Sequence, residues 1–422
     1  MATASVPHEG NLTTLSRDDV ADLHDAAGDL LADAVVLRRT LHEWPELGNH
    51  LPRTREAVLA ALEGLPLHLT LHDTTSGVAA VLEGAKPGPT VLLRGDMDAL
   101  PMPEDTGLDF SSRVDQCMHA CGHDTHTAML VGAARLLSAR RSDLAGRVLF
   151  MFQPGEEGHH GARYMLDEGL LELPDLSDGS PSPITGAFAL HVTSALPSGW
   201  LGTRPGPVMA SSDELRIVVT GAGGHASEPH RTRDPIPVAC EIVQALQTMV
   251  TRRIDVFDPT VVTIARISAG TTYNVIPETA EIVGTIRAVS ERTRAKVHDG
   301  VRRVAEGIAA AHEVTVEVQL VRGYPVTVND SAHANRALDV ARATVAGRGR
   351  VAELPNPIMG AEDFSYVLQR VPGVMMFLGG TAPDRDPATA APNHSNRVLF
   401  DEQAMTTGIA TYAALALDHL RA

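Results

Sequence analysis

The stretch "RVLFMFQPGEE", residues 147–157, decides the fold class, because an uninterrupted apolar run ends in a turn that carries two acids. Strands that are apolar on both faces are typical of parallel sheets covered by helices. Similar runs occur at 77–84 ("GVAAVLEG"), 90–96 ("TVLLRGD") and 184–192 ("ITGAFALHV"), and helical patterns such as residues 126–141 separate them. The sequence therefore predicts an α/β fold with a mostly parallel sheet.

Alternation of polar and apolar residues replaces this pattern near residue 210. The elements expected from there to residue 326 follow the order β-α-β-β-α-β, which is the split βαβ, ferredoxin-like arrangement of an α+β domain. We therefore predict a small domain at residues 210–326, inserted into a larger domain made of residues 19–209 and 327–422. Residues 1–18 are expected to form a flexible leader.

The composition excludes several classes of protein. The chain has 422 residues, a formal net charge of −17 and three cysteines. Such acidity argues against nucleic-acid binding, which normally needs a basic face. No apolar run approaches the roughly 18–20 residues of a membrane span, and the first residues lack the apolar core of a signal peptide. We expect a reduced, cytoplasmic protein that binds neither nucleic acid nor membrane and has no structural disulfide.

Residues that can bind a metal or move a proton follow the expected strands. Ligands in open α/β sheets bind beyond the carboxyl ends of the strands. Five segments bring such groups to this edge: Asp96 and Asp98, Glu156 and Glu157, His191, His394, and Cys121 with His123. Thiolate, imidazole and carboxylate together suit a borderline transition metal. One glutamate can bind the metal while its neighbour takes a proton from water, as metal-assisted hydrolysis requires.

Each of these residues taken alone has a simpler explanation. A single histidine such as His191 is usually a satisfied, half-buried side chain. Glu156 and Glu157 could form a solvated turn, and Cys121 could be a small core residue. Cys121 and His123 could also be a nucleophile and its base. These explanations do not account for the joint occurrence at strand ends, so the sequence favours a metal centre in which Cys121 is a ligand and not a nucleophile.

Several blocks of the chain resemble the M20 metallopeptidase family, most of all its amidohydrolase branch of hippurate hydrolases, N-acyl-amino-acid deacylases and auxin-conjugate hydrolases. The blocks include "MHACGHDTHTAMLVGAARLL" (118–137), "FQPGEEGHHGARYMLDEGLL" (152–171), "GAGGHASEPH" (221–230), "YNVIPETAEIVGTIR" (273–287) and "MGAEDFSY" (359–366). The resemblance implies a zinc-peptidase-like catalytic domain that carries a ferredoxin-like lid or dimerisation domain.

The resemblance also implies a site for two divalent ions, usually Mn²⁺ or Zn²⁺, with Co²⁺ or Ni²⁺ as further options. The matching ligand positions are Cys121, His123, Glu157, His191 and His394. Glu156 would be the general base, and Asp98 the carboxylate that orients a histidine ligand.

Four positions in or near the inserted domain resemble the family's substrate contacts. His225 matches the histidine that stabilises the oxyanion at the scissile carbonyl, often across a dimer. Asn274 and Arg287 match groups that hold the substrate carboxylate, and Gly360 is a further substrate-binding position.

Two features depart from the usual pattern of the family. Leu51 stands where a glutamate is usual, and His159–His160 stand where small residues are common. These histidines could form a solvated turn, narrow the acyl pocket or add a metal ligand. Both departures affect the expected substrate preference and leave the expected chemistry intact.

The leading hypothesis is a metal-dependent amidohydrolase that cleaves the amide bond of N-acyl amino acids or dipeptide-like substrates. It would act as a homodimer or dimer-based oligomer through the domain at 210–326. A carboxypeptidase or dipeptidase of the same family is one alternative, and a non-catalytic metal-binding protein on this fold is another. The presence of Glu156 argues against the last, because a binding protein has no use for a free base beside a metal.

Overall fold

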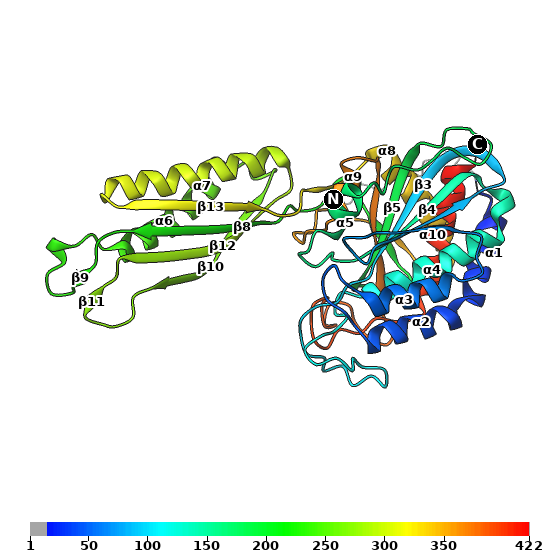
Figure 1. Ribbon diagram of the computed structural model, residues 1–422, viewed down its shortest axis with the longest axis horizontal. Coiled ribbons are helices and arrows are strands. Elements are labelled where there is room, and N and C mark those ends of the chain that lie inside the picture. The colour runs from blue at the N-terminus through cyan, green and yellow to red at the C-terminus, as the bar shows by residue number, and fades with distance from the viewer. Residues whose placement is uncertain (1–14, 422) are drawn as a thin grey trace, which may run out of the picture. The chain divides into compact units, whose positions relative to one another are not determined.

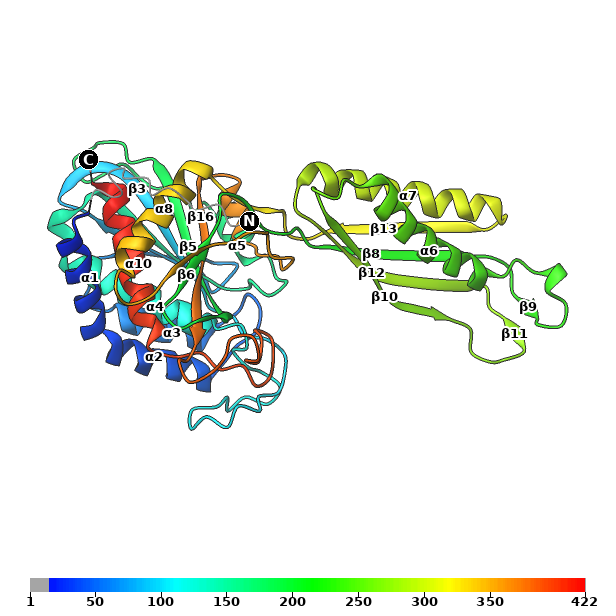
Figure 2. The same cartoon turned by 180° about the vertical axis from the view of Figure 1, so that it is seen from behind.

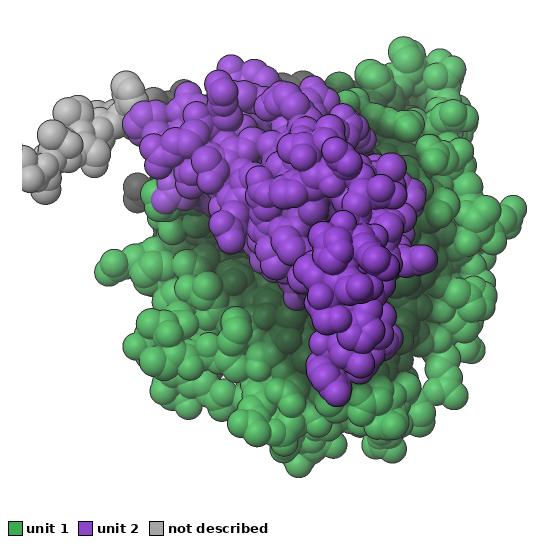
Figure 3. Space-filling view, turned by 90° about the vertical axis from the view of Figure 1, so that its left-hand side faces the viewer, with its two compact units in different colours: residues 1–206, 328–355, 366–422 green, residues 207–327, 356–365 purple. Residues whose placement is uncertain are grey.

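The computed structural model describes residues 15–421, which form two compact units (Figure 3). The first unit contains the chain up to residue 206 together with 328–355 and 366 onward, and the second contains 207–327 and 356–365. The sequence predicts that residues 356–365 belong to the larger domain. They group with the second unit, where the backbone N–H of Ala210 donates to the carbonyls of Ile358 (3.0 Å) and Gly360 (2.9 Å).

An eight-stranded sheet forms the centre of the first unit, in the order β1-β2-β4-β3-β5-β16-β6-β15. The four central strands β4, β3, β5 and β16 are parallel, whereas β1, β2 and β6 each have an antiparallel neighbour. The expected mostly parallel sheet is confirmed. The strands are β1 (His68–Leu71), β2 (Val78–Glu83), β3 (Lys86–Asp96), β4 (Ala145–Gln153), β5 (Ile184–Pro197), β6 (Leu201–Thr203), β15 (Val351–Glu353) and β16 (Gly373–Thr381).

Helices α4 and α10 pack against each other and against β3, as both cartoon views show (Figures 1 and 2). Helix α10 is mostly apolar and is buried around nearly its whole circumference. The hydroxyl of Tyr412 donates to the carbonyl of Arg94 (2.6 Å) and accepts from the N–H of Leu190 (3.0 Å), so it links β3 to β5. The helices of this unit are α1 (Arg17–Asp29), α2 (Leu31–Glu43), α3 (Pro52–Leu62), α4 (His123–Ala139), the 3₁₀ turn η1 (Arg141–Asp143), α5 (Gly161–Asp167), α8 (Ser331–Thr344), α9 (Ser365–Leu368) and α10 (Ala404–Leu420).

The N-terminal helical region differs from the expectation of one helix from Val20 to about Thr40. It forms α1 and α2, which are separated at Leu30, where the N–H of Leu30 bonds back to Ala27 and closes the first helix. Helix α1 begins at Arg17 after a cap by Ser16, so the helix starts inside the expected leader. Residues 1–14 of that leader lie outside the described residues.

A four-stranded antiparallel sheet in the order β10-β12-β8-β13 forms the second unit. Helices α6 and α7 cover one face (Figures 1 and 2). Leu215, Ile217 and Val219 point to that covered face and are buried, whereas Glu214 and Arg216 alternate with them on the open face. The expected β-α-β-β-α-β order is present, as β8 (Asp213–Thr220), α6 (Pro235–Arg253), β10 (Thr260–Ala269), β12 (Thr279–Ala288), α7 (Glu291–Ala311) and β13 (Thr315–Arg322).

Four short strands complete the fold. Strands β9 (Gly224–His225) and β11 (Val275–Ile276) pair as a ribbon beyond one end of the four-stranded sheet (Figure 1), with the short turn η2 (Pro229–Arg231) beside it. Strands β7 (Gly206–Met209) and β14 (Thr327–Asn329) pair with each other. Among the described helices, none combines the length and the apolar character that a membrane crossing needs.

The strand ends position most of the expected site residues. Strand β3 ends at Asp96 and β4 ends at Gln153, so the acid pairs begin at or just beyond the sheet edge. His191 differs from the expectation, because β5 continues beyond it to Pro197 alongside β16. His191 therefore lies within a strand rather than at its end.

Candidate metal centre

Two groups of candidate ligands share the thiol of Cys121. One group is Cys121, His123 and His191, the other is Cys121, Glu157 and His394, and in each the ligand atoms lie within 4.8 Å of one another. The sulfur is 3.4 Å from Nε2 of His191 and 3.3 Å from Nε2 of His394. The same Nε2 of His394 lies 3.2 Å from Oε1 of Glu157. The structure thus brings together all five residues that the sequence nominates as ligands.

His123 is the first residue of α4, and its ring is fully buried. Its Nδ1 faces Oδ1 of Asp98 at 3.3 Å, and its Nε2 faces Oδ2 of Asp96 at 3.4 Å. Burial opposes protonation, but Asp96 and the Cys121 sulfur outweigh it and hold the pKa of His123 well above its usual value. Two carboxylates therefore flank this imidazole, one beside each ring nitrogen.

The next residue of α4, Asp124, anchors the start of the helix to α2. Its Oδ2 forms an ion pair with the Arg38 guanidinium, 2.8 Å from Nε, and a hydrogen bond with Nδ1 of His42 at 2.7 Å. All three side chains are buried, and the cost of burying the carboxylate is offset because the cation and the imidazole both bond to it. This network holds the backbone from which His123 projects.

Glu156 and Glu157 lie on the turn after β4, and Asp98 holds that turn. Oδ1 of Asp98 accepts the backbone N–H of Glu156 at 2.9 Å, and Oδ2 accepts that of Glu157 at 3.0 Å. Glu157 belongs to the group that contains Cys121 and His394, and Glu156 does not. Oε2 of Glu156 and Oε1 of Glu157 both lie 3.9 Å from Nε2 of His123. Both acids therefore face His123, and only Glu157 is also grouped with Cys121 and His394.

Unpartnered atoms show that the residues present fit a divalent ion. Both ring nitrogens of His123 and Oε1 of Glu157 are buried, yet they form no hydrogen bond of acceptable geometry with the described residues. Such atoms cost about 1–3 kcal/mol each when left unsatisfied. Nδ1 of His191 donates to the Val192 carbonyl at 2.8 Å, so its Nε2 presents a lone pair to the same site. Thiol, imidazole and carboxylate are the donors that divalent transition metals prefer.

The pKa values also indicate ligands rather than a nucleophile. Burial and the Glu157 carboxylate raise the pKa of the Cys121 thiol, so that the unassisted group is a weak nucleophile. Burial and His126 hold the pKa of His191 well below its usual value, which keeps that imidazole neutral, as a ligand must be. The close approach of the Cys121 sulfur and the Glu157 carboxylate to Nε2 raises the pKa of His394 to about 10. A bound divalent cation would instead lower the pKa of the Cys121 thiol, because a coordinated thiol is deprotonated.

The sequence did not point to two residues that support the site, the buried His126 and the half-buried Asn393. His126 donates through Nδ1 to Asp96 at 2.5 Å and accepts at Nε2 from the N–H of Val192 at 2.7 Å. Asn393 donates to the carbonyls of Cys121 (3.3 Å) and Val192 (3.0 Å). His126 follows His123 by three residues and shares its helix face, which is a usable signal. For Asn393 the only signal is that it precedes a candidate ligand.

In the second unit, the β9–β11 ribbon places His225 beside Asn274. His225 pairs with Val275, and the N–H of Ala226 donates to the carbonyl of Asn274 at 3.1 Å. The backbone N–H and the hydroxyl of Ser227 lie 3.1 and 2.7 Å from Nδ1 of His225. A backbone N–H can only donate, so the neutral His225 ring carries its proton on Nε2.

Arg287 lies at the other end of the same sheet. It is near the last residue of β12, and eight residues of extended chain, roughly 26 Å, separate it from the end at Thr279 that adjoins the ribbon. Gly360 lies at the Arg287 end, since Ala210 donates to its carbonyl. Within one chain the structure therefore does not bring Arg287 and Asn274 together.

The guanidinium of Arg287 has no carboxylate partner within salt-bridge distance among the described residues. Two other arginines of the sheet do have a carboxylate partner. Arg216 and Arg266 both pair with Glu281, at 2.7 and 2.6 Å. Burial lowers the pKa of Arg287, and the more distant Asp213 opposes that shift. A half-buried cation with no internal counter-ion can accept an external carboxylate.

The departures from the family pattern have local explanations. Leu51 is fully buried in the core of the first unit. His159 is exposed, and His160 is half-buried with Nδ1 3.0 Å from the hydroxyl of Tyr366. Neither histidine belongs to the groups of candidate ligands found among the described residues.

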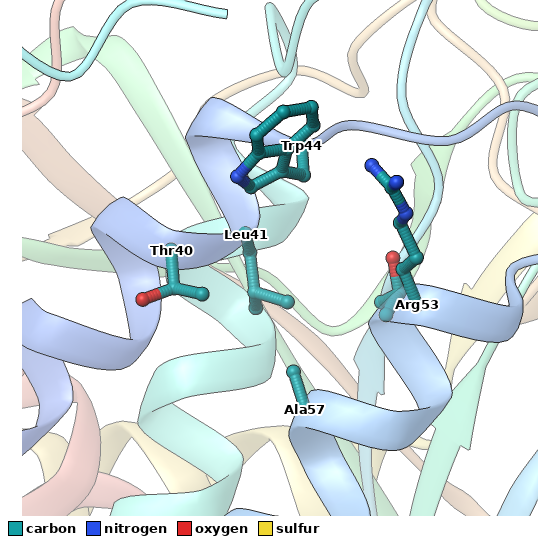
Figure 4. A pocket seen from close by; sticks show the side chains of 6 residues that line it. Thr40, Leu41, Trp44, Arg53 and Ala57 are labelled. Atoms are coloured by element: carbon teal, nitrogen blue, oxygen red, sulfur yellow. The ribbon is translucent and has the colours of Figure 1, made fainter. Parts of the chain in front are cut away.

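A hollow of about 210 Å³ lies beside α2 and α3, away from these groups (Figure 4). Arg53 stacks over the ring of Trp44 at 4.7 Å on its rim. The lining residues are Thr40, Leu41, Trp44, Arg53, Thr54 and Ala57, and none is an acid, a thiol or an imidazole. This hollow has no catalytic group and is not the candidate site.

Comparison with known proteins shows which family the chain is similar to. The family model described as peptidase family M20/M25/M40 matches residues 92–418. Thermostable carboxypeptidase 1 of Saccharolobus solfataricus is 38% identical, and the alignment covers 91% of this chain and 94% of that protein. The N-acetylcysteine deacetylase of Bacillus subtilis is also 38% identical, over 91% of this chain and 96% of the deacetylase.

A solved structure has the same fold. The YXEP protein of Bacillus subtilis, described as a dinuclear metal binding peptidase from the M20 family, superposes with a TM-score of 0.78 at 35% identity. The superposition covers 93% of this chain and 99% of that protein.

Proposed function

The chain belongs to peptidase family M20/M25/M40 and is a hydrolase, and on that premise we propose that it cleaves the amide bond of N-acyl amino acids, releasing the acyl group and the amino acid. One observation carries the proposal: Asp98 holds Glu156 and Glu157 on one turn, and only Glu157 is grouped with Cys121 and His394. That arrangement leaves one acid beside Cys121 and His394 as a ligand and places its neighbour, Glu156, next to His123, where it could move a proton.

Two divalent ions would be held by the five ligand residues, Cys121, His123, Glu157, His191 and His394. Mn²⁺ or Zn²⁺ are the proposed ions, and Co²⁺ or Ni²⁺ would also suit these donors. When bound, such ions supply Lewis acidity, which polarises the scissile carbonyl and eases loss of a proton from water. Asp98 would keep His123 in a fixed orientation through Nδ1, where the two atoms are 3.3 Å apart.

Glu156 is the proposed general base. It would take a proton from the attacking water as the new C–O bond forms, and return a proton to the nitrogen as the C–N bond breaks. His225 would donate its Nε2–H to the oxyanion, since Ser227 already occupies Nδ1. Arg287 would hold the carboxylate of the amino-acid half.

The separation within the second unit supports a site completed by a second copy. His225 and Asn274 lie at one end of the four-stranded sheet, and Arg287 and Gly360 lie at the other, roughly 26 Å away along β12. A single small substrate cannot span that distance. We propose that a homodimer supplies His225 and Asn274 from one chain and Arg287 from the other.

The similarity to thermostable carboxypeptidase 1 favours a second candidate, removal of a C-terminal residue from a peptide, for which the same base and the same arginine would serve. A substrate panel tests both activities. N-acetyl and N-benzoyl amino acids and dipeptides would be compared with Mn²⁺, Zn²⁺ or Co²⁺ supplied. The proposal expects the largest kcat/KM on an N-acyl amino acid; faster cleavage of dipeptides would favour the second candidate, and no turnover on the whole panel would contradict both.

A further inference from the structure

Asn49 lies against the turn that carries Glu156 and Glu157, although it stands outside every group named so far. Its side-chain Nδ2 donates to the carbonyl of His159 at 2.9 Å. Its Oδ1 is sealed from solvent and has no hydrogen-bond partner among the described residues. An amide in this position touches the turn with both of its polar atoms.

The backbone of the turn packs directly on that amide. A Cβ built on Gly155 would lie 1.8 Å from Oδ1 of Asn49, and one built on Gly161 would lie 3.1 Å from the same atom. Gly155 precedes the two glutamates and Gly161 follows them, so Asn49 contacts the turn on both sides of the acids. The absence of side chains at these two positions is what allows so close an approach.

The turn itself is strained and needs support from outside. Its backbone enters the left-handed region at Gly155 (φ 67°), at Gly158 (φ 82°) and at His160 (φ 57°), where a non-glycine residue pays a conformational cost. Such a conformation persists only where the surrounding structure determines it.

Asn49 is in turn held by the core of the first unit. Its carbonyl accepts the N–H of Ser76 at 2.8 Å, and the hydroxyl of Ser76 accepts the N–H of Leu51 at 2.7 Å. Leu51 is fully buried. Asn49 therefore supports the turn from the core side, while Asp98 binds the two glutamate N–H groups.

We propose that Asn49 is a positioning residue that fixes where the Glu156 carboxylate reaches. The inference rests on the proposed function, because Asn49 positions Glu156, the base of that reaction. A displacement of about 1 Å at a reacting group can cost on the order of 10²-fold in rate. Asn49 does not touch substrate or metal in this assignment, so its loss should affect kcat and leave substrate binding and metal content nearly unchanged.

The test compares Asn49→Asp and Asn49→Ala with His159→Ala in the metal-loaded enzyme. Asn49→Asp keeps the shape of the side chain but replaces the donor with an oxygen that faces the His159 carbonyl. His159→Ala removes an exposed ring but keeps the carbonyl that Asn49 binds. We expect both Asn49 variants to lose roughly 10- to 100-fold in kcat, with KM and metal per chain close to wild type, and His159→Ala to behave like wild type.

Hydrogen exchange of the backbone amides of Glu156 and Glu157 gives a readout that is independent of activity. The Asn49 variants should exchange these amides faster than wild type and His159→Ala. Unchanged exchange, unchanged kcat, an equal loss in His159→Ala, or a loss explained by missing metal would each overturn the inference. If the wild type hydrolyses no substrate of the panel but Asn49→Asp still speeds the exchange, the proposed function fails and Asn49 remains the residue that holds the turn.

Discussion

The thiol sulfur of Cys121 lies 3.4 Å from Nε2 of His191, although 70 residues separate the two in the chain. The same sulfur lies 3.3 Å from Nε2 of His394. Cys121 thus belongs to both groups of candidate ligands, and a thiolate there would adjoin two cations at once. This shared position is the structural reason to treat Cys121 as a ligand rather than as a nucleophile.

Glu156→Gln should leave metal content intact and lower kcat by several powers of ten. General-base help alone is worth roughly 10²–10⁴-fold, and an amide cannot accept the proton of the attacking water. Metal analysis and steady-state kinetics of the same preparation check this. Glu157→Gln is the matched control and should lose metal as well as activity. Metal loss in Glu156→Gln instead would mean that the roles of the two acids are exchanged.

Arg287→Ala should weaken kcat/KM for N-acyl amino acids far more than for the corresponding amides, which lack the carboxylate. A charge-assisted bond to a carboxylate is worth about 1.5–3 kcal/mol, or roughly 10- to 150-fold. Arg216→Ala is the control, because Arg216 lies on the same open face but already pairs with Glu281. Equal losses on both substrates would indicate that Arg287 is structural.

Co-expressed Glu156→Gln and His225→Ala chains should recover activity that neither variant has alone. In a mixed dimer one site keeps its own Glu156 and receives His225 from the other chain. Random assortment into symmetric dimers predicts roughly a quarter of the wild-type rate for the whole preparation and roughly half for the mixed dimers alone. Recovery is checked on affinity-separated mixed dimers. If the mixed dimers remain as inactive as the parents, His225 serves its own chain or has no part in the reaction.

Acid should destabilise the first unit through His419, whose Nε2 lies 2.8 Å from Oγ1 of Thr185. Burial, with the nearby His333, lowers the pKa of His419 to about 4 from 6.5. The unfolded chain therefore binds the proton first, so the free energy of unfolding falls as the pH drops from about 6.5 to 4, by at most about 3 kcal/mol.

Denaturant unfolding between pH 7 and 4 measures this loss in metal-free protein. His419→Gln should lose less stability than wild type over the interval, because a group that cannot titrate contributes no slope. His68→Gln replaces an exposed histidine on β1 and should follow the wild type. Parallel curves for wild type and His419→Gln would contradict the assignment.

Much of the fold could be predicted because its signals are local. The buried strands are continuous apolar runs, and the acids at Asp96 and Glu156 come directly after two of them. The helix break at Leu30 could not be predicted, since the apolar pattern continues through both helices and the break depends on hydrogen bonds back to Ala27 and Gly28. The grouping of residues 356–365 with the second unit likewise depends on contacts made far away in the chain.

The candidate site, too, could be predicted from the sequence only in part. The strand-end rule nominated the edge of the sheet, and the family resemblance nominated the individual ligands that the structure brings together. Asn49 carried no signal, and Asn393 only its place before His394, because each acts through backbone carbonyls of segments more than 100 residues away. The sequence also does not show that Arg287 and Asn274 lie at opposite ends of the sheet. That follows only from the register of β12.

The measurement that tests the central claim most directly is the hydrolysis rate of an N-acyl amino acid as a function of bound metal per chain. The protein would be stripped with chelator, dialysed, and reloaded in steps with Mn²⁺ or Zn²⁺, with metal and rate measured on each sample. The account predicts no turnover in the stripped protein, recovery on reloading, and a maximal rate near two ions per chain. It also predicts that Cys121 is protected from alkylation only when metal is bound. Full turnover in the stripped protein that is lost on alkylation of Cys121 would contradict the metal centre and make Cys121 the nucleophile.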